Sequence, residues 1–202
     1  VSNELGYVGN FAEQGITLDL RVYADKLDHL VTSQRVVVPA VPGVSFFNGT
    51  ALTPTGIAFS AVNKSQAKIM GYEAHARYRP GAKTDVFISY ANTRISSDDA
   101  DLERTMPRNT FSLLATQQLP YRLQGSVGYY QMSSVEPLSE GNLIPVARRL
   151  DMRLAYRMGR IGSDFHGGEV ALVLQNLLGK YADFERANIA QQRAYMSLEL
   201  PW

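Results

Sequence analysis

The last segment of the chain alternates apolar and polar side chains at successive positions and ends in an aromatic residue. Successive side chains of a β-strand point to opposite faces, so this period of two predicts a strand with two unlike faces. One face carries Met196, Leu198, Leu200 and Trp202, and the other carries Arg193, Tyr195, Ser197 and Glu199. This pattern is typical of the closing strand of a transmembrane barrel, and it also fits an amphipathic strand of a soluble sandwich or lipocalin-like barrel.

The same alternation recurs in eight earlier segments of the chain. The first covers Asn3 to Phe11, and the others begin near Ile16, Met70, Asp85, Phe111, Leu123, Arg149 and Glu169. Most of the nine predicted strands have a length of about 10 residues or more, which is what a tilted strand needs to cross a bilayer. The pattern therefore predicts an all-β, antiparallel fold.

The connections between the predicted strands alternate strictly between short and long. The short ones lie near residues 12–15, 80–83 and 119–121, with a moderate one at 159–167, and the long ones cover about 29–66, 95–107, 133–147 and 177–192. Transmembrane barrels have short periplasmic turns and long extracellular loops, so this asymmetry favours such a barrel over a soluble sandwich. Single-chain bacterial barrels have even strand numbers. Nine predicted strands therefore mean either that the count is wrong by one or that the chain is part of a larger barrel.

Composition excludes several functions. The net charge of +1 gives no electrostatic reason to expect a nucleic-acid partner. The absence of cysteine excludes disulfides, thiolate metal sites and a cysteine nucleophile. The chain begins at Val1 without an initiator methionine, so we expect a processed product or a fragment.

Several short motifs, in this order and spacing, resemble the TonB-dependent outer-membrane receptors. They are Glu4-Leu5-Gly6-Tyr7, Ile16 to Tyr23, Asn63 with Ile69 to Glu73, Tyr78-Arg79-Pro80, Pro107-Arg108-Asn109, Arg149 to Tyr156, Gln175 to Leu178 with Tyr181, and Trp202. Members of this family are barrels of about 22 strands plugged by an N-terminal domain. The resemblance implies that residues 1–202 are the C-terminal portion of the barrel domain, without the plug domain.

The resemblance also implies a function, a location and partners. The function is TonB-dependent uptake of a ferric siderophore or a similar large, scarce nutrient across the bacterial outer membrane. The partners are outer-membrane lipid, the protein's own plug domain, the TonB energy-coupling protein acting through the missing N-terminal part, and the outer-membrane assembly machinery. That machinery would read Leu198, Leu200 and Trp202, which are also candidate lipid anchors. The resemblance implies no enzymatic activity, cofactor or catalytic residue.

The polar positions of the predicted strands form the candidate lumen lining. They include Asp19, Arg21, Glu73, His75, Arg77, Arg149, Asp151 and Arg153, with Asp25, Asp85, Arg157, Glu169, Arg193 and Glu199 in the same pattern. We expect most of them to contact a plug or water, and fewer to contact substrate. The three histidines form no ligand cluster. Glu73 and His75, spaced by two on the same face, could share a metal, but we expect no metal site.

The predicted loop at 29–66 is the best candidate for collecting ligand, because long ordered loops are often functional. Its adjacent Phe46 and Phe47 suit contact with an apolar or aromatic ligand, and suit packing of the loop on itself equally well. An alternative function is a small standalone outer-membrane barrel, either a passive pore or a structural protein. A barrel-borne enzyme fits least, because no serine is an evident partner for His75.

Overall fold

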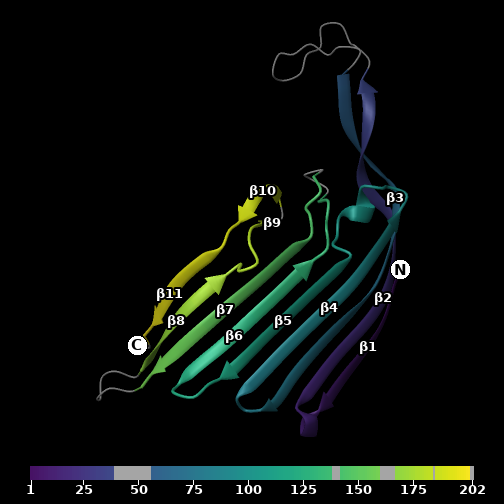
Figure 1. The fold of residues 1–202 in the computed structure, drawn as a ribbon. Coiled ribbons are helices and arrows are strands. Elements are labelled where there is room, and N and C mark those ends of the chain that lie inside the picture. The colour runs from purple at the N-terminus through teal and green to yellow at the C-terminus, as the bar shows by residue number, and fades with distance from the viewer. Residues whose placement is uncertain (39–55, 138–141, 160–166, 184, 201–202) are drawn as a thin grey trace.

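The computed structural model describes residues 1–38, 56–137, 142–159, 167–183 and 185–200. Nine strands form one antiparallel sheet in the order β1-β2-β3-β4-β5-β6-β7-β8-β11 (Figure 1). Their bounds are Ser2–Phe11 (β1), Ile16–Val38 (β2), Gly56–Gly81 (β3), Thr84–Ser97 (β4), Asn109–Gln118 (β5), Leu123–Met132 (β6), Ala147–Met158 (β7), Gly168–Gln175 (β8) and Arg193–Glu199 (β11). The predicted antiparallel all-β fold is confirmed, with neighbours in the sequence paired throughout β1 to β8.

Three short elements complete the described structure. A two-stranded sheet joins β9 (Tyr181–Asp183) to β10 (Glu185–Ala190), and 3₁₀ turns cover Ala12–Gln14 (η1) and Leu102–Arg104 (η2). In the described part of the chain, no helix is long and apolar enough to cross a membrane.

Short and long connections lie at opposite ends of the sheet, as the sequence predicts (Figure 1). We call the end with the short connections the turn rim and the other end the loop rim. The turn between β5 and β6 is tight, because Tyr121 and Arg122 both have positive φ (58° and 62°). Two successive residues of positive φ make the type I′ turn that matches the twist of paired strands.

The prediction of a loop over residues 29–66 is wrong for much of that range. β2 continues to Val38 and β3 begins at Gly56, and these two residues face each other in the register. The pairing passes register shifts between Leu27 and Val31, where His29 has a φ of 59°. Such a bulge interrupts the two-residue period that reveals a strand in sequence. Phe46 and Phe47 lie outside the described residues.

The register sorts side chains into two faces that continue across all nine strands. The apolar face includes Leu5, Tyr7, Leu18, Leu20, Val22, Met70, Tyr72, Ile88, Tyr90, Phe111, Leu113, Val127, Tyr129, Leu150, Met152, Leu154, Leu172, Met196 and Leu198. The polar face includes Glu4, Asp19, Arg21, Glu73, His75, Arg77, Asp85, Ser112, Tyr130, Arg149, Asp151, Arg153, Glu169 and Glu199. The alternation read from single strands therefore adds up to one coherent surface on each side.

The apolar face has no covering layer in the described structure. Only seven apolar residues there are buried, and five of these are alanines. Large side chains of the apolar face remain exposed, among them Leu5 (73%), Met196 (73%) and Leu198 (63%). A soluble sandwich would bury this face against a second sheet, whereas a continuous exposed apolar surface indicates a membrane or a partner.

Both edges of the sheet are open. Among the described residues, β1 pairs only with β2, and β11 pairs only with β8. Unpaired backbone groups cannot face hydrocarbon, so a lipid-embedded wall of this kind needs further strands at these edges. The described residues thus form an open sheet, which is consistent with part of a larger barrel, and within them β1 and β11 do not pair to close a small one.

Substitution of neighbouring residues on β5 tests the two faces. We expect Leu113→Arg in the complete protein to lower the free energy of unfolding by about 2–4 kcal/mol, since arginine at mid-membrane depth must face lipid. Ser112→Arg places the same side chain on the polar face, opposite Ser89 and Tyr130, and should cost much less. Urea titration of the protein refolded in lipid vesicles measures both. Equal losses for the two variants would contradict the assignment of the faces.

Candidate functional site

The polar face collects the charged residues predicted from the strand pattern. Asp19 lies opposite His75 in the register, and Arg21 lies opposite Glu73. Asp151 and Arg153 lie on the same face farther along the sheet, opposite Gly128 and Ser126. All fourteen residues predicted to face a lumen share this polar face, while the lumen itself stays a prediction.

Ion pairs tie neighbouring strands together across the polar face. Arg21 lies 3.0 Å from Glu4 on β1 and 3.8 Å from Glu73 on β3. Two similar groups join Arg77 and Arg79 to Asp85, and Arg153 and Arg157 to Glu169. Most of these arginines are about half exposed, and such pairs contribute less than about 1 kcal/mol each. Their main effect is to balance charge on the face.

His75 does not belong to a metal centre in the described structure. Its ring stacks on Phe87 with centroids 6.0 Å apart and planes at 15°. Its Nδ1 atom is buried and has no hydrogen-bond partner among the described residues. No group of three or more described Asp, Glu or His side chains could hold a metal ion.

Asp151 connects the sheet to the segment that follows β8. Its carboxylate accepts a hydrogen bond from Arg149 Nε at 2.9 Å and another from the backbone N–H of Asn176 at 2.9 Å. Asn176 is 3% exposed, has a φ of 59°, and donates through Nδ2 to the carbonyl of Ala190 at 3.1 Å. The carboxylate therefore holds the start of the connection that carries β9 and β10, and the Asn176 side chain ties that start to the end of β10.

A small apolar cluster holds two loop-rim connections together. Val135 and Ile144 form a β-bridge between β6 and β7, and both side chains pack with Ala182 of β9. Ile144 is 1% exposed, and Met132 packs against the cluster from the end of β6. Ordered loops of this kind present their polar side chains in fixed positions.

A hollow of about 560 Å³ opens at the loop rim of the polar face. It is lined by Ser112, Tyr130, Arg149, Tyr181 and Asp183, among others. Arg149 lies over the Tyr130 ring, with its guanidinium carbon 5.9 Å from the ring centroid. A cation, phenol groups and a carboxylate around one hollow suit a polar ligand with acceptor and donor groups.

The sequence pattern found part of this hollow. It singled out Arg149 as a charged strand residue, but gave no role to Tyr130, Tyr181 or Asp183. Tyr181 was visible only as part of a family motif. Of the residues predicted to signal assembly, Leu198 lies on the apolar face, Leu200 follows β11 and is 46% exposed, and Trp202 lies outside the described residues.

Comparisons with known proteins agree with this geometry. No family model matches the chain. The ferric-pyoverdine 358 receptor of Pseudomonas putida is 32% identical over 120 residues, a match covering 58% of this chain and 13% of that receptor. The unliganded ferric citrate transporter FecA aligns with a TM-score of 0.67 at 16% identity over 98% of this chain and 30% of its own. The outer-membrane ferripyoverdine receptor of Pseudomonas aeruginosa aligns at 0.66 with 14% identity, over 98% and 26%.

The chain has the barrel fold of TonB-dependent outer-membrane receptors. The predicted resemblance is thereby confirmed, and the proteins compared are named as receptors and a transporter. The chain spans less than a third of each solved structure, and its match covers about an eighth of the Pseudomonas putida receptor.

Removal of the Asp151 carboxylate tests its role at the loop rim. Asp151→Ala should speed hydrogen exchange of the Asn176 amide by about 10- to 100-fold, because a hydrogen bond to a charged acceptor contributes about 1.5–3 kcal/mol. Asp85→Ala removes a carboxylate of the same face that bonds only arginines, and should leave that amide unchanged. Hydrogen exchange measured by mass spectrometry compares the two variants. Equal exchange rates of the Asn176 amide in both would contradict the bond from Asn176 to Asp151.

Proposed function

We propose that this chain forms wall and ligand-facing loops of an outer-membrane receptor that takes up a ferric siderophore, or a similar large and scarce nutrient, by a TonB-dependent mechanism. The observation that carries the proposal is the continuous division of the sheet into an uncovered apolar face and a charged face. Similarity to a receptor named for ferric pyoverdine, and the fold shared with a ferric citrate transporter, support the substrate class.

In this proposal the apolar face contacts outer-membrane lipid and the polar face lines the lumen. The ion-paired arginines and carboxylates of the polar face would contact water and the plug domain of the complete protein. A lining of balanced charge suits this role, because it neither attracts nor repels one sign of charge over the whole wall. The plug would also provide the connection to the TonB energy-coupling protein.

The loop rim would make the ligand contacts from this chain. Arg149, Tyr130 and Tyr181 present a cation and two phenols around the hollow at the end of the lumen where substrate enters. Ferric complexes with oxygen-rich ligands offer acceptors for these groups. We propose no catalytic step for any residue, and we propose that Leu198, Leu200 and Trp202 act in assembly of the barrel.

Uptake by intact cells tests the function. Deletion of the gene should abolish accumulation of iron supplied as radiolabelled ferric pyoverdine or ferric citrate, for at least one complex of a siderophore panel. Restoring the complete gene should restore uptake only while the inner membrane is energised and TonB is present. Uptake that persists after TonB is removed would contradict the proposal and favour a passive pore.

A matched pair of variants tests the hollow. Replacing Arg149 by Ala and Tyr181 by Phe in the complete protein should weaken binding of the transported complex by about 10- to 100-fold, the effect of losing a charged hydrogen bond. Arg122→Ala with Tyr121→Phe makes the same chemical changes at the turn rim and should leave affinity unchanged. Calorimetric titration of purified protein measures both, and equal affinities would show that ligand binds elsewhere.

A further inference from the structure

A second hollow lies on the opposite side of the sheet from the polar lining. Its volume is about 620 Å³, and its lining includes Tyr129, Val146, Arg148, Leu178 and Lys180. Tyr129 and Arg148 belong to the apolar face, because their register partners are Leu150 and Gln131. Arg148 and Tyr181 border both hollows, whereas Tyr129, Leu178 and Lys180 line the second one and not the hollow on the polar side.

The two cations of this hollow have no counter-ion in the described structure. No described carboxylate lies within ion-pair distance of Arg148 or Lys180. The adjacent Arg149 points to the polar face and is paired with Asp151 at 2.6 Å. No acidic residue lines the hollow either. The site therefore has a net positive charge and lacks an internal anion.

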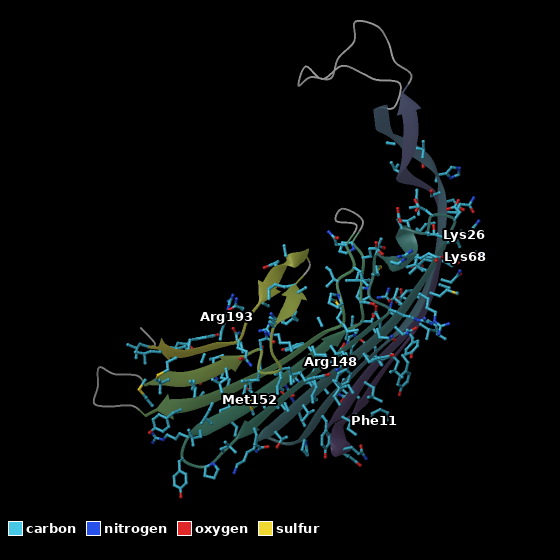
Figure 2. The ribbon with its side chains drawn as sticks, turned by 45° about the horizontal axis from the view of Figure 1, so that its top comes forward. Phe11, Lys26, Lys68, Arg148, Met152 and Arg193 are labelled. Atoms are coloured by element: carbon cyan, nitrogen blue, oxygen red, sulfur yellow. The ribbon has the colours of Figure 1, made fainter. Side chains whose placement is uncertain are left out.

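A second group of cations on the apolar side does have carboxylates close by. Lys26 and Lys68 face each other near the loop rim, well apart from Arg148 (Figure 2). Lys26 lies 3.2 Å from Asp28, and the hollow beside these lysines also contains Asp98. Their charge is thus partly compensated by the chain itself, unlike the charge of Arg148 and Lys180.

The position of the hollow between the apolar band and the loop rim indicates which kind of molecule carries the anion that these cations lack. On the same face of β7, Arg148 comes just before the apolar run of Leu150, Met152, Leu154 and Tyr156, and it lies nearer the loop rim. Tyr129 stands opposite Leu150, and its hydroxyl donates to Gln131 at 2.8 Å. Aromatic residues and basic residues at the end of an apolar band mark the depth of lipid headgroups.

Apolar side chains complete the site. Leu178 is 53% exposed and Val146 is 48% exposed, and both line the hollow next to the cations. An ion alone would gain nothing from these surfaces, whereas a lipid places a phosphate beside the cations and its acyl chains against the apolar side chains. The combination distinguishes a lipid site from a site for free phosphate.

We propose that this hollow binds the phosphate-bearing headgroup of an anionic membrane lipid, with Arg148 and Lys180 as its phosphate ligands. The inference rests on the proposed placement of the apolar face in lipid. It adds a bound anionic lipid at the loop rim, next to the connection that carries β9, on the outside of the same wall that borders the ligand hollow.

Lipid quenching in vesicles tests the site. The complete protein would carry a fluorophore at Leu150→Cys, beside the hollow, or at Leu20→Cys on the apolar face of the distant β2. Brominated phosphatidylglycerol should quench the Leu150 label at lower mole fraction than brominated phosphatidylcholine, and the two lipids should quench the Leu20 label equally. The preference should fall about fivefold with Arg148→Gln or Lys180→Gln, and about thirtyfold with both.

Controls separate charge from folding. Arg193→Gln removes an exposed arginine from the polar face, opposite Gln175, and should keep the preference. Arg148→Lys should keep most of it, and heat-modifiable gel mobility verifies that each variant is folded. An excess of inorganic phosphate should leave the preference unchanged, and its loss would identify a free-phosphate site instead.

Two failures can be told apart. A wild-type protein whose Leu150 label is quenched without preference, or a double variant that keeps the preference, overturns the lipid site and leaves the receptor function standing. Labels that neither brominated lipid quenches would overturn the placement of the apolar face in lipid, and with it the proposed function.

Discussion

The structure depends on one constraint, the continuous antiparallel register that runs from β1 to β8 and on to β11. In a sheet, a slip of one residue moves every side chain of a strand to the other face. Below the register shifts of β2, all eight carboxylates of the nine-stranded sheet lie on the polar face, so a slip in any strand that carries one would carry charge to the apolar side. The need to keep charge on one face therefore stabilises the register, and the register in turn determines which face each side chain occupies.

Adjacent arginines of β7 show how this constraint separates two environments within one peptide unit. Arg149 on the polar face is neutralised by Asp151, whose second partner, the Asn176 backbone, orders the following connection. Arg148 points the opposite way, where the described chain offers it no carboxylate. A cation with no carboxylate partner among the described residues, at the end of an apolar band, depends on its surroundings for an anion. The same strand thus borders both the hollow on the polar side and the hollow on the apolar side.

The strand alternation was enough to predict nine strands, their order of short and long connections and the membership of both faces. Prediction failed where the period of two breaks. The bulge around His29 interrupts the alternation, so the sequence predicts a loop where the structure pairs β2 with β3 as far as Val38. The segment from Asn176 to Gln192 has no period at all, and its first residue is held by a long-range bond to Asp151. Contacts of that kind leave no local signal in a sequence.

The same reasoning explains why the fold agrees so well with proteins of low identity. A barrel wall requires only that apolar and polar side chains alternate, and many sequences meet this requirement. FecA and the ferripyoverdine receptor share this chain's fold at 16% and 14% identity. Recognition of a ligand requires instead particular groups at particular points. In the proposed function, Arg149, Tyr130 and Tyr181 around one hollow would be such groups. We therefore expect differences in substrate among proteins of this fold to arise at the loop rim, partly from side chains such as Tyr181 that the nine-stranded register does not place.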